Sequence, residues 1–209
     1  RFYSKFLSDR EILEAAATKG LHAKIMRYGN LAARHRDGEF QINSSSNSAM
    51  GSLRVYAALK CAPFDDLNKP QEFSPIDAVA EATVKLAATP EKCRVFHVLS
   101  DHTIPLGHVL GEMRAMGHQI DFVEREAYEE DLASALSDPK RAELLTSLMA
   151  YTFGEGERKR KLIEVNRDYT LQVLYRLGFT WPMTSWDYFR RFMGLLNGFG
   201  YFDESFDNN

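Results

Sequence analysis

Arg94-Val-Phe-His-Val-Leu99 is the clearest β-strand in this sequence of 209 residues. The segment is rich in β-branched and aromatic residues, and it is bounded by Pro90 and by Ser100-Asp101. Working outward, the apolar pattern predicts helices over residues 76–88 and 104–116 and a further short strand over 119–123. Because helices alternate with strands, the sequence predicts an α/β fold with a mainly parallel sheet.

Toward the N-terminus the same alternation continues. A helix is predicted over residues 6–19, ending at Gly20, and a short buried strand follows over 22–28, ending at Gly29-Asn30. A second helix, over 49–59, stops before Pro63. The sequence starts at Arg1 without an initiator Met and is helical almost at once, so we expect the chain to be cut from a larger protein.

Beyond Glu124 the pattern changes to helices alone, which we expect over residues 126–136, 139–151, 166–177 and 185–197. We therefore predict two portions, an α/β portion over 1–123 and a helical lobe over 124–209. The lobe contains the basic run Arg158-Lys-Arg-Lys161. Such a run is usually a solvated surface, and the alternative is a patch for an acidic partner.

Composition excludes several classes of protein. The formal net charge is −3, and 26 basic residues are outnumbered by 29 acidic ones, which argues against binding to nucleic acid. No apolar run approaches the roughly 18 to 20 residues that span a bilayer, and no signal peptide opens the chain, so we expect a cytoplasmic protein without a membrane partner. The two cysteines, Cys61 and Cys93, are expected to be buried free thiols.

Common catalytic motifs are absent from the sequence. It contains no Gly-x-Gly-x-x-Gly turn, no Walker motif, no His-Glu-x-x-His and no Gly-x-Ser-x-Gly. His97, His102 and His108 are close in sequence, but a strand, a loop and a helix do not space ligands as metal sites do, so we predict no metal.

Short motifs in series point to a family. Ser4-Lys5-Phe6, the helix to Gly20-Leu21 and Met26-Arg-Tyr-Gly-Asn-Leu31 resemble the stretch of an extended short-chain dehydrogenase/reductase that runs from the catalytic lysine to the strand behind the nicotinamide. Four further segments narrow the resemblance: Gly38-Glu-Phe-Gln-Ile-Asn43, Leu53-Arg-Val-Tyr-Ala57, Phe73-Ser-Pro-Ile-Asp77 and Val95-Phe-His-Val98. Together these segments look like the terminal thioester reductase domains of nonribosomal peptide synthetases, which are related to carboxylic acid and aminoadipate reductases.

The resemblance extends from Ser4 to about Phe202 and implies a fold and a reaction. It implies the C-terminal half of an NAD(P)-binding Rossmann-type domain with a mostly helical substrate lobe. The implied enzyme is an NADPH-dependent oxidoreductase that releases a peptidyl or acyl thioester, held on the phosphopantetheine of a carrier protein, as an aldehyde or alcohol.

The resemblance also implies roles for individual residues. Lys5 would be catalytic and would bind the cofactor, because its ammonium lowers the pKa of a catalytic tyrosine and contacts the nicotinamide ribose. Gly29, Asn30 and Leu31 would line the cofactor at the end of a strand. Phe73, Ser74 and Pro75 would bind substrate by bordering the acyl channel.

The sequence departs from the family pattern before Lys5. The Gly-rich turn and the catalytic threonine of the family precede the lysine and are not in this sequence, and the position of the tyrosine, four residues before Lys5, is Arg1. Tyr3 is only two residues away and would point to another face of the helix. We therefore expect no NADPH turnover by this chain alone. Two alternatives stay open: another extended short-chain enzyme, of the sugar-nucleotide epimerase or dehydratase type, and a non-catalytic module that docks a carrier protein.

Overall fold

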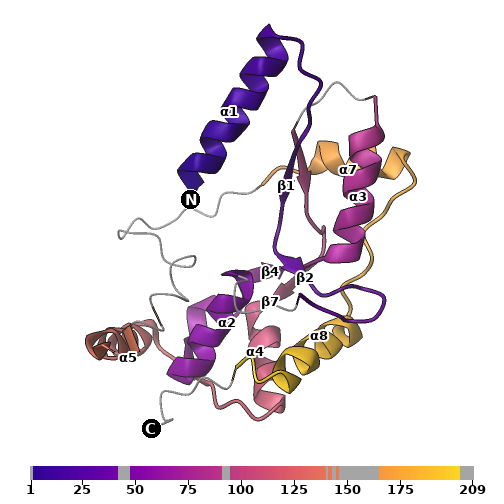
Figure 1. The fold of residues 1–209 in the computed structure, drawn as a ribbon. Helices are drawn as coiled ribbons and strands as arrows, with labels where there is room; N and C mark the ends of the chain where they lie inside the picture. The colour runs from indigo at the N-terminus through magenta and orange to yellow at the C-terminus, as the bar shows by residue number, and fades with distance from the viewer. Residues whose placement is uncertain are drawn as a thin grey trace.

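The computed structural model describes residues 2–41, 48–90, 95–139, 141–142, 145 and 165–202 (Figure 1). Its helices are α1 (Phe2–Thr18), α2 (Ser48–Leu59), α3 (Ile76–Ala88), α4 (Leu106–Ala115), α5 (Arg125–Ser137), α7 (Asp168–Arg176) and α8 (Trp186–Gly198), with a short 3₁₀ turn η2 (Phe64–Asp66). Its strands are β1 (Ile25–Tyr28), β2 (Leu31–Ala32), β3 (Cys61–Pro63), β4 (Pro70–Glu72), β5 (Ser74–Pro75), β6 (Val95–Val98), β7 (Thr103–Pro105) and β8 (Asp121–Val123).

The strands pair two by two. β1 pairs with β6, β2 with β5 and β3 with β8, all in parallel, whereas β4 and β7 are antiparallel. Strands far apart in the sequence therefore lie side by side, joined by crossover helices. The α/β class with mainly parallel pairing is confirmed.

Two large apolar clusters hold most of these elements together, and a smaller one joins α2 to α5 through Val55 and Ala135. The first lies between α2, α4 and α8 and includes Leu53, Leu110, Phe189 and Phe192, each almost fully buried. The second lies between α3, β6 and α7, in the upper right of Figure 1, and its buried side chains include Leu86, Phe96, Val98, Val173 and Leu174. Helices from beyond residue 124 thus pack against elements from before it. The division into an α/β portion over 1–123 and a helical lobe over 124–209 stays a prediction.

Most expected elements are present where the structure describes the chain, and the helix expected over 139–151 lies mostly outside the described residues. Two expectations are corrected. The strand predicted over 22–28 forms only over 25–28, and its predicted burial is wrong at Arg27 and Tyr28, which are exposed; Arg27 pairs with Asp9 of α1. The helix expected from residue 104 begins at Leu106. Pro105 disfavours the helical conformation of the residue before it, and Thr103–Pro105 forms β7 against β4 instead.

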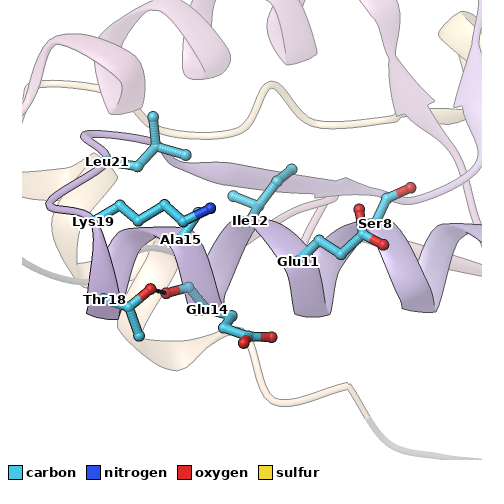
Figure 2. Close-up of a pocket in the computed structure, with 8 residues that line it drawn as sticks. All are labelled: Ser8, Glu11, Ile12, Glu14, Ala15, Thr18, Lys19 and Leu21. Atoms are coloured by element: carbon cyan, nitrogen blue, oxygen red, sulfur yellow. Dashed lines mark hydrogen bonds between the residues drawn. The ribbon is translucent and has the colours of Figure 1, made fainter.

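Helix α1 lies at one side of the fold, and little of it is buried. Ala16 is its buried apolar residue, while Tyr3 is 72% and Phe6 60% exposed. A hollow of about 680 Å³ lies along this helix. Figure 2 shows the residues that line it: Ser8, Glu11, Ile12, Glu14, Ala15, Thr18, Lys19 and Leu21. Among the described residues, no helix is both long and apolar enough to cross a membrane.

The cysteine prediction is confirmed where the structure describes it. Cys61 is a buried free thiol at the start of β3. Burial, a hydrogen bond to Asp131 and that carboxylate's charge raise the pKa of the thiol to about 12, so it stays protonated at neutral pH. Cys93 lies outside the described residues.

Candidate functional site

The predicted cofactor and substrate segments lie side by side at the ends of strands. β1 ends at Tyr28, and Gly29-Asn30 lead directly into β2. Leu31 of β2 is in register with Ser74 of β5, and the Ser74 amide donates to the Asn30 carbonyl at 2.8 Å. The structure thus brings the segment Gly29-Asn30-Leu31 together with Phe73-Ser74-Pro75, some forty residues later in the sequence.

A residue that the sequence reasoning missed, Glu72, joins the two segments. Its carboxylate accepts a hydrogen bond from the Asn30 backbone N–H at 2.7 Å, and its backbone carbonyl accepts one from the Asn30 side-chain amide at 3.1 Å. The Ser74 hydroxyl donates to the other carboxylate oxygen of Glu72. The Glu72 carboxylate therefore joins the Gly29-Asn30 turn to Ser74 at the start of β5.

The same network reaches the end of β6. The buried Ser74 hydroxyl accepts from the Ser100 amide at 2.8 Å, and the Arg167 guanidinium donates to the Ser100 carbonyl at 2.7 Å. Arg167 also lines a cavity of about 500 Å³ with Leu99, Val165, Asn166 and Asp168. We call the polar group Asn30, Glu72, Ser74, Ser100 and Arg167 the strand-end cluster.

Gly29 is required by the approach of Glu72. A Cβ atom at this position would lie 2.3 Å from the Glu72 Oε2 and 2.7 Å from the Leu99 Cβ, both far inside van der Waals contact. The backbone of Gly29 is not in the left-handed region where the structure places Gly20 and Gly38, so its need for glycine is one of space and not of φ. The lack of a side chain at Gly29 therefore leaves room for the Glu72 carboxylate and for Leu99.

The environment of Glu72 favours its neutral form. Burial raises the pKa of Glu72 above its ordinary value of 4.5, although the hydrogen bonds from Ser74, Asn30 and Ser100 and the charge of Arg167 lower it. Desolvation of a carboxylate is costly, and the surrounding donors offset only part of that cost.

Lys5 is exposed on α1, and no hydrogen bond among the described residues joins it to the strand-end cluster. Its position along the fold is nevertheless defined by Asp9, one helical turn later on the same face, which pairs with Arg27 of β1 at 2.7 Å. α1 and β1 run in opposite directions (Figure 1). Lys5 therefore precedes by one helical turn the residue that ties α1 to β1, and its role at the cofactor stays a prediction.

The other predicted substrate residues have packing roles. Phe73 is buried in the first apolar cluster, with its ring 5.4 Å from that of Phe189. Pro75 precedes the first residue of α3, the helix start with a proline entry that the sequence predicts. Substrate binding by Phe73, Ser74 and Pro75 stays a prediction. The basic run Arg158–Lys161 lies outside the described residues.

Comparison with known proteins gives no match to a family model or to a curated protein, but solved structures match. A thiolation-reductase di-domain from an archaeal non-ribosomal peptide synthetase is 32% identical with a TM-score of 0.79, covering 95% of this chain and 40% of that chain. The reductase domain of the aureusimine biosynthetic cluster (23%, TM-score 0.73) and the terminal R domain of the myxalamid pathway (20%, TM-score 0.71) share the fold.

The matched chains are longer than this chain. Each covers 94% or more of this chain, whereas this chain covers between 40% and 50% of the matched chains. The enzyme of Bordetella bronchiseptica called WbmF, solved with NAD⁺ and UDP, shares the fold more distantly, at 14% identity and a TM-score of 0.53. The chain is therefore similar over nearly its whole length to part of the reductase of a non-ribosomal peptide synthetase, and it has the fold of the short-chain dehydrogenase/reductase domains.

Proposed function

We propose that the chain is part of an NADPH-dependent reductase that releases a peptidyl or acyl thioester from a carrier protein as an aldehyde or alcohol. The observation that carries the proposal is the 32% identity, over 95% of this chain, to a protein in which a reductase is joined to a thiolation domain. A thiolation domain presents its acyl group as a thioester on a phosphopantetheine arm, so the partner of this chain is a carrier of that kind.

The residues present fit the nicotinamide end of the cofactor. Lys5 is an exposed ammonium on α1, one helical turn before the Asp9 that pairs with β1, and Asn30 is exposed after the end of β1, where α/β proteins bind ligands. The Gly-rich turn that would hold the pyrophosphate is not in this sequence. The bound cofactor would supply a hydride to the thioester carbonyl.

The chain's own residues would bind and stabilise. In this proposal Lys5 donates hydrogen bonds to ribose hydroxyls, and its positive charge stabilises the oxyanion that forms on the substrate carbonyl. Gly29, Asn30 and Leu31 line the nicotinamide through their backbone. Collapse of the reduced thioester then breaks the C–S bond, which leaves an aldehyde and returns a free thiol to the carrier. A second hydride transfer would give the alcohol.

The test uses the complete reductase domain that contains this chain. Purified enzyme is mixed with NADPH and one of three substrates: an acyl group loaded on a carrier protein, the same acyl group as a free acid, or a nucleotide sugar. The proposal predicts loss of nicotinamide absorbance with the loaded carrier alone, together with aldehyde or alcohol by mass spectrometry. Turnover of the nucleotide sugar would favour an epimerase or dehydratase instead. Carrier binding without turnover would indicate a docking module.

A further inference from the structure

We propose that Glu72 is a positioning residue for cofactor binding: its carboxylate holds the Gly29-Asn30 turn in the shape that receives the nicotinamide end. This inference rests on the proposed function, because it assigns the turn to the cofactor. It names a residue that lies outside the motifs in the sequence and that touches the proposed ligand through no atom of its own.

Several hydrogen bonds converge on Glu72. Asn30 donates to the carboxylate at 2.7 Å through its backbone and to the Glu72 carbonyl at 3.1 Å through its side chain. Ser74 donates to the same carboxylate and accepts from the Ser100 amide at 2.8 Å. Glu72 therefore links the ends of β1, β4 and β6 and the start of β5.

The fold accepts two costs in order to place a carboxylate at position 72. The site requires a glycine at position 29, because a Cβ there would lie 2.3 Å from the Glu72 Oε2 and 2.7 Å from the Leu99 Cβ. It also desolvates an ionisable group, which costs stability. The carboxylate in return accepts hydrogen bonds from the Asn30 amide and the Ser74 hydroxyl, and so it fixes the geometry of the turn.

The turn that Glu72 holds lies at the surface and is connected to a cavity wall. Asn30 is exposed on its outer side, although its amide and side chain are both bonded inward to Glu72. The turn is joined through Glu72, Ser74 and Ser100 to Arg167, which lines the 500 Å³ cavity. A ligand at the strand ends would meet a backbone that Glu72 has already ordered, which lowers the entropic cost of binding.

The substitutions separate positioning from charge. Glu72→Gln keeps an oxygen that accepts from the Asn30 amide, and its NH₂ group can donate to the Ser74 hydroxyl, which has a second lone pair free for that bond. Glu72→Ala removes both bonds. Glu112→Ala is the matched control, because Glu112, like Glu72, is a carboxylate with a neighbouring donor, but it lies on α4, where it is buried and pairs with Arg190.

The experiment measures NADPH binding and turnover in the complete domain, and amide hydrogen exchange in the 209-residue chain. We expect Glu72→Ala to weaken NADPH binding about tenfold or more, with the KM for the loaded carrier unchanged, and to speed exchange at the Asn30 amide by a similar factor. Glu72→Gln should stay within about threefold of the wild type in both measurements. Glu112→Ala should lower the melting temperature without changing either.

Three outcomes would overturn the inference. Wild-type NADPH affinity in Glu72→Ala, despite faster exchange at Asn30, would show that the turn is held but does not serve the cofactor. A Glu72→Gln variant as impaired as Glu72→Ala would show that charge matters and position does not. A wild-type domain that binds no NADPH would overturn both this inference and the proposed function, whereas one that binds NADPH but leaves the thioester unreduced contradicts the proposed function alone.

Discussion

At the scale of single residues, Gly29 shows how a small side chain can be required by a distant one. We expect Gly29→Ala to lower the free energy of unfolding by about 1–3 kcal/mol, the usual cost of forcing extra volume into a packed site. The reason is the 2.3 Å approach to the Glu72 Oε2 and the 2.7 Å approach to the Leu99 Cβ. Urea denaturation of both proteins measures the difference.

A second glycine provides the control for this prediction. Gly111 lies inside α4, and a Cβ there would meet nothing within 4 Å. Gly111→Ala should therefore stabilise the protein by about 0.5–1 kcal/mol, because alanine is the better helix former. If Gly29→Ala were as harmless as Gly111→Ala, the close contact with Glu72 would not exist in solution.

Glu72 also makes the stability of the protein depend on pH. Its folded-state pKa is raised by burial, so between the unfolded value near 4.5 and the folded value the native state holds the proton more tightly than the unfolded state. The contribution of Glu72 to stability therefore falls as pH rises through this window. Glu72→Gln removes the titration, so its stability relative to wild type should increase between about pH 4 and pH 7 in urea denaturation. A relative stability that declines over this range would reverse the assigned shift.

At the scale of elements, the helices were predictable and the short strands were not. The helix over 76–88 was expected with the bounds of α3, because its apolar residues recur at helical spacing and Pro75 and Pro90 flank it. β2, β4 and β5 have two or three residues each, too few to show an alternating pattern. Glu72 lies in such a strand between Pro70 and Phe73, in a segment that reads as a loop, so no sequence signal singled it out.

The start of α8 offers a test at this scale. Ser185 caps the helix, and its hydroxyl accepts from the Tyr188 amide at 3.3 Å, as the sequence Thr184-Ser185 before an apolar run predicts. Ser185→Ala should cost about 0.5–2 kcal/mol of unfolding free energy. Ser137→Ala, at the exposed end of α5, should change it by less than about 0.5 kcal/mol. Equal effects in thermal unfolding would show that the cap contributes nothing.

At the scale of the whole molecule, the pairing of distant segments could be predicted only in part. Alternating helices and strands indicate a parallel α/β fold, and Gly29-Asn30 was expected at the end of a strand. That this turn meets residues 72–75 follows from the β2–β5 register, a pairing of residues some forty positions apart that leaves no local trace in the sequence. Lys5 was singled out by resemblance alone, and the structure adds that its helix is tied to β1 by the Arg27–Asp9 pair.

We propose Lys5 as the catalytic lysine of a thioester reductase, and the Lys5→Ala variant of the complete domain tests this role. Turnover of NADPH with an acyl-loaded carrier should fall by about 10²–10⁴, with weaker NADPH binding, and Lys5→Arg should rescue little. Arg10→Ala, on another face of the exposed α1, should behave as wild type. Near-normal turnover and cofactor affinity in Lys5→Ala would contradict the account.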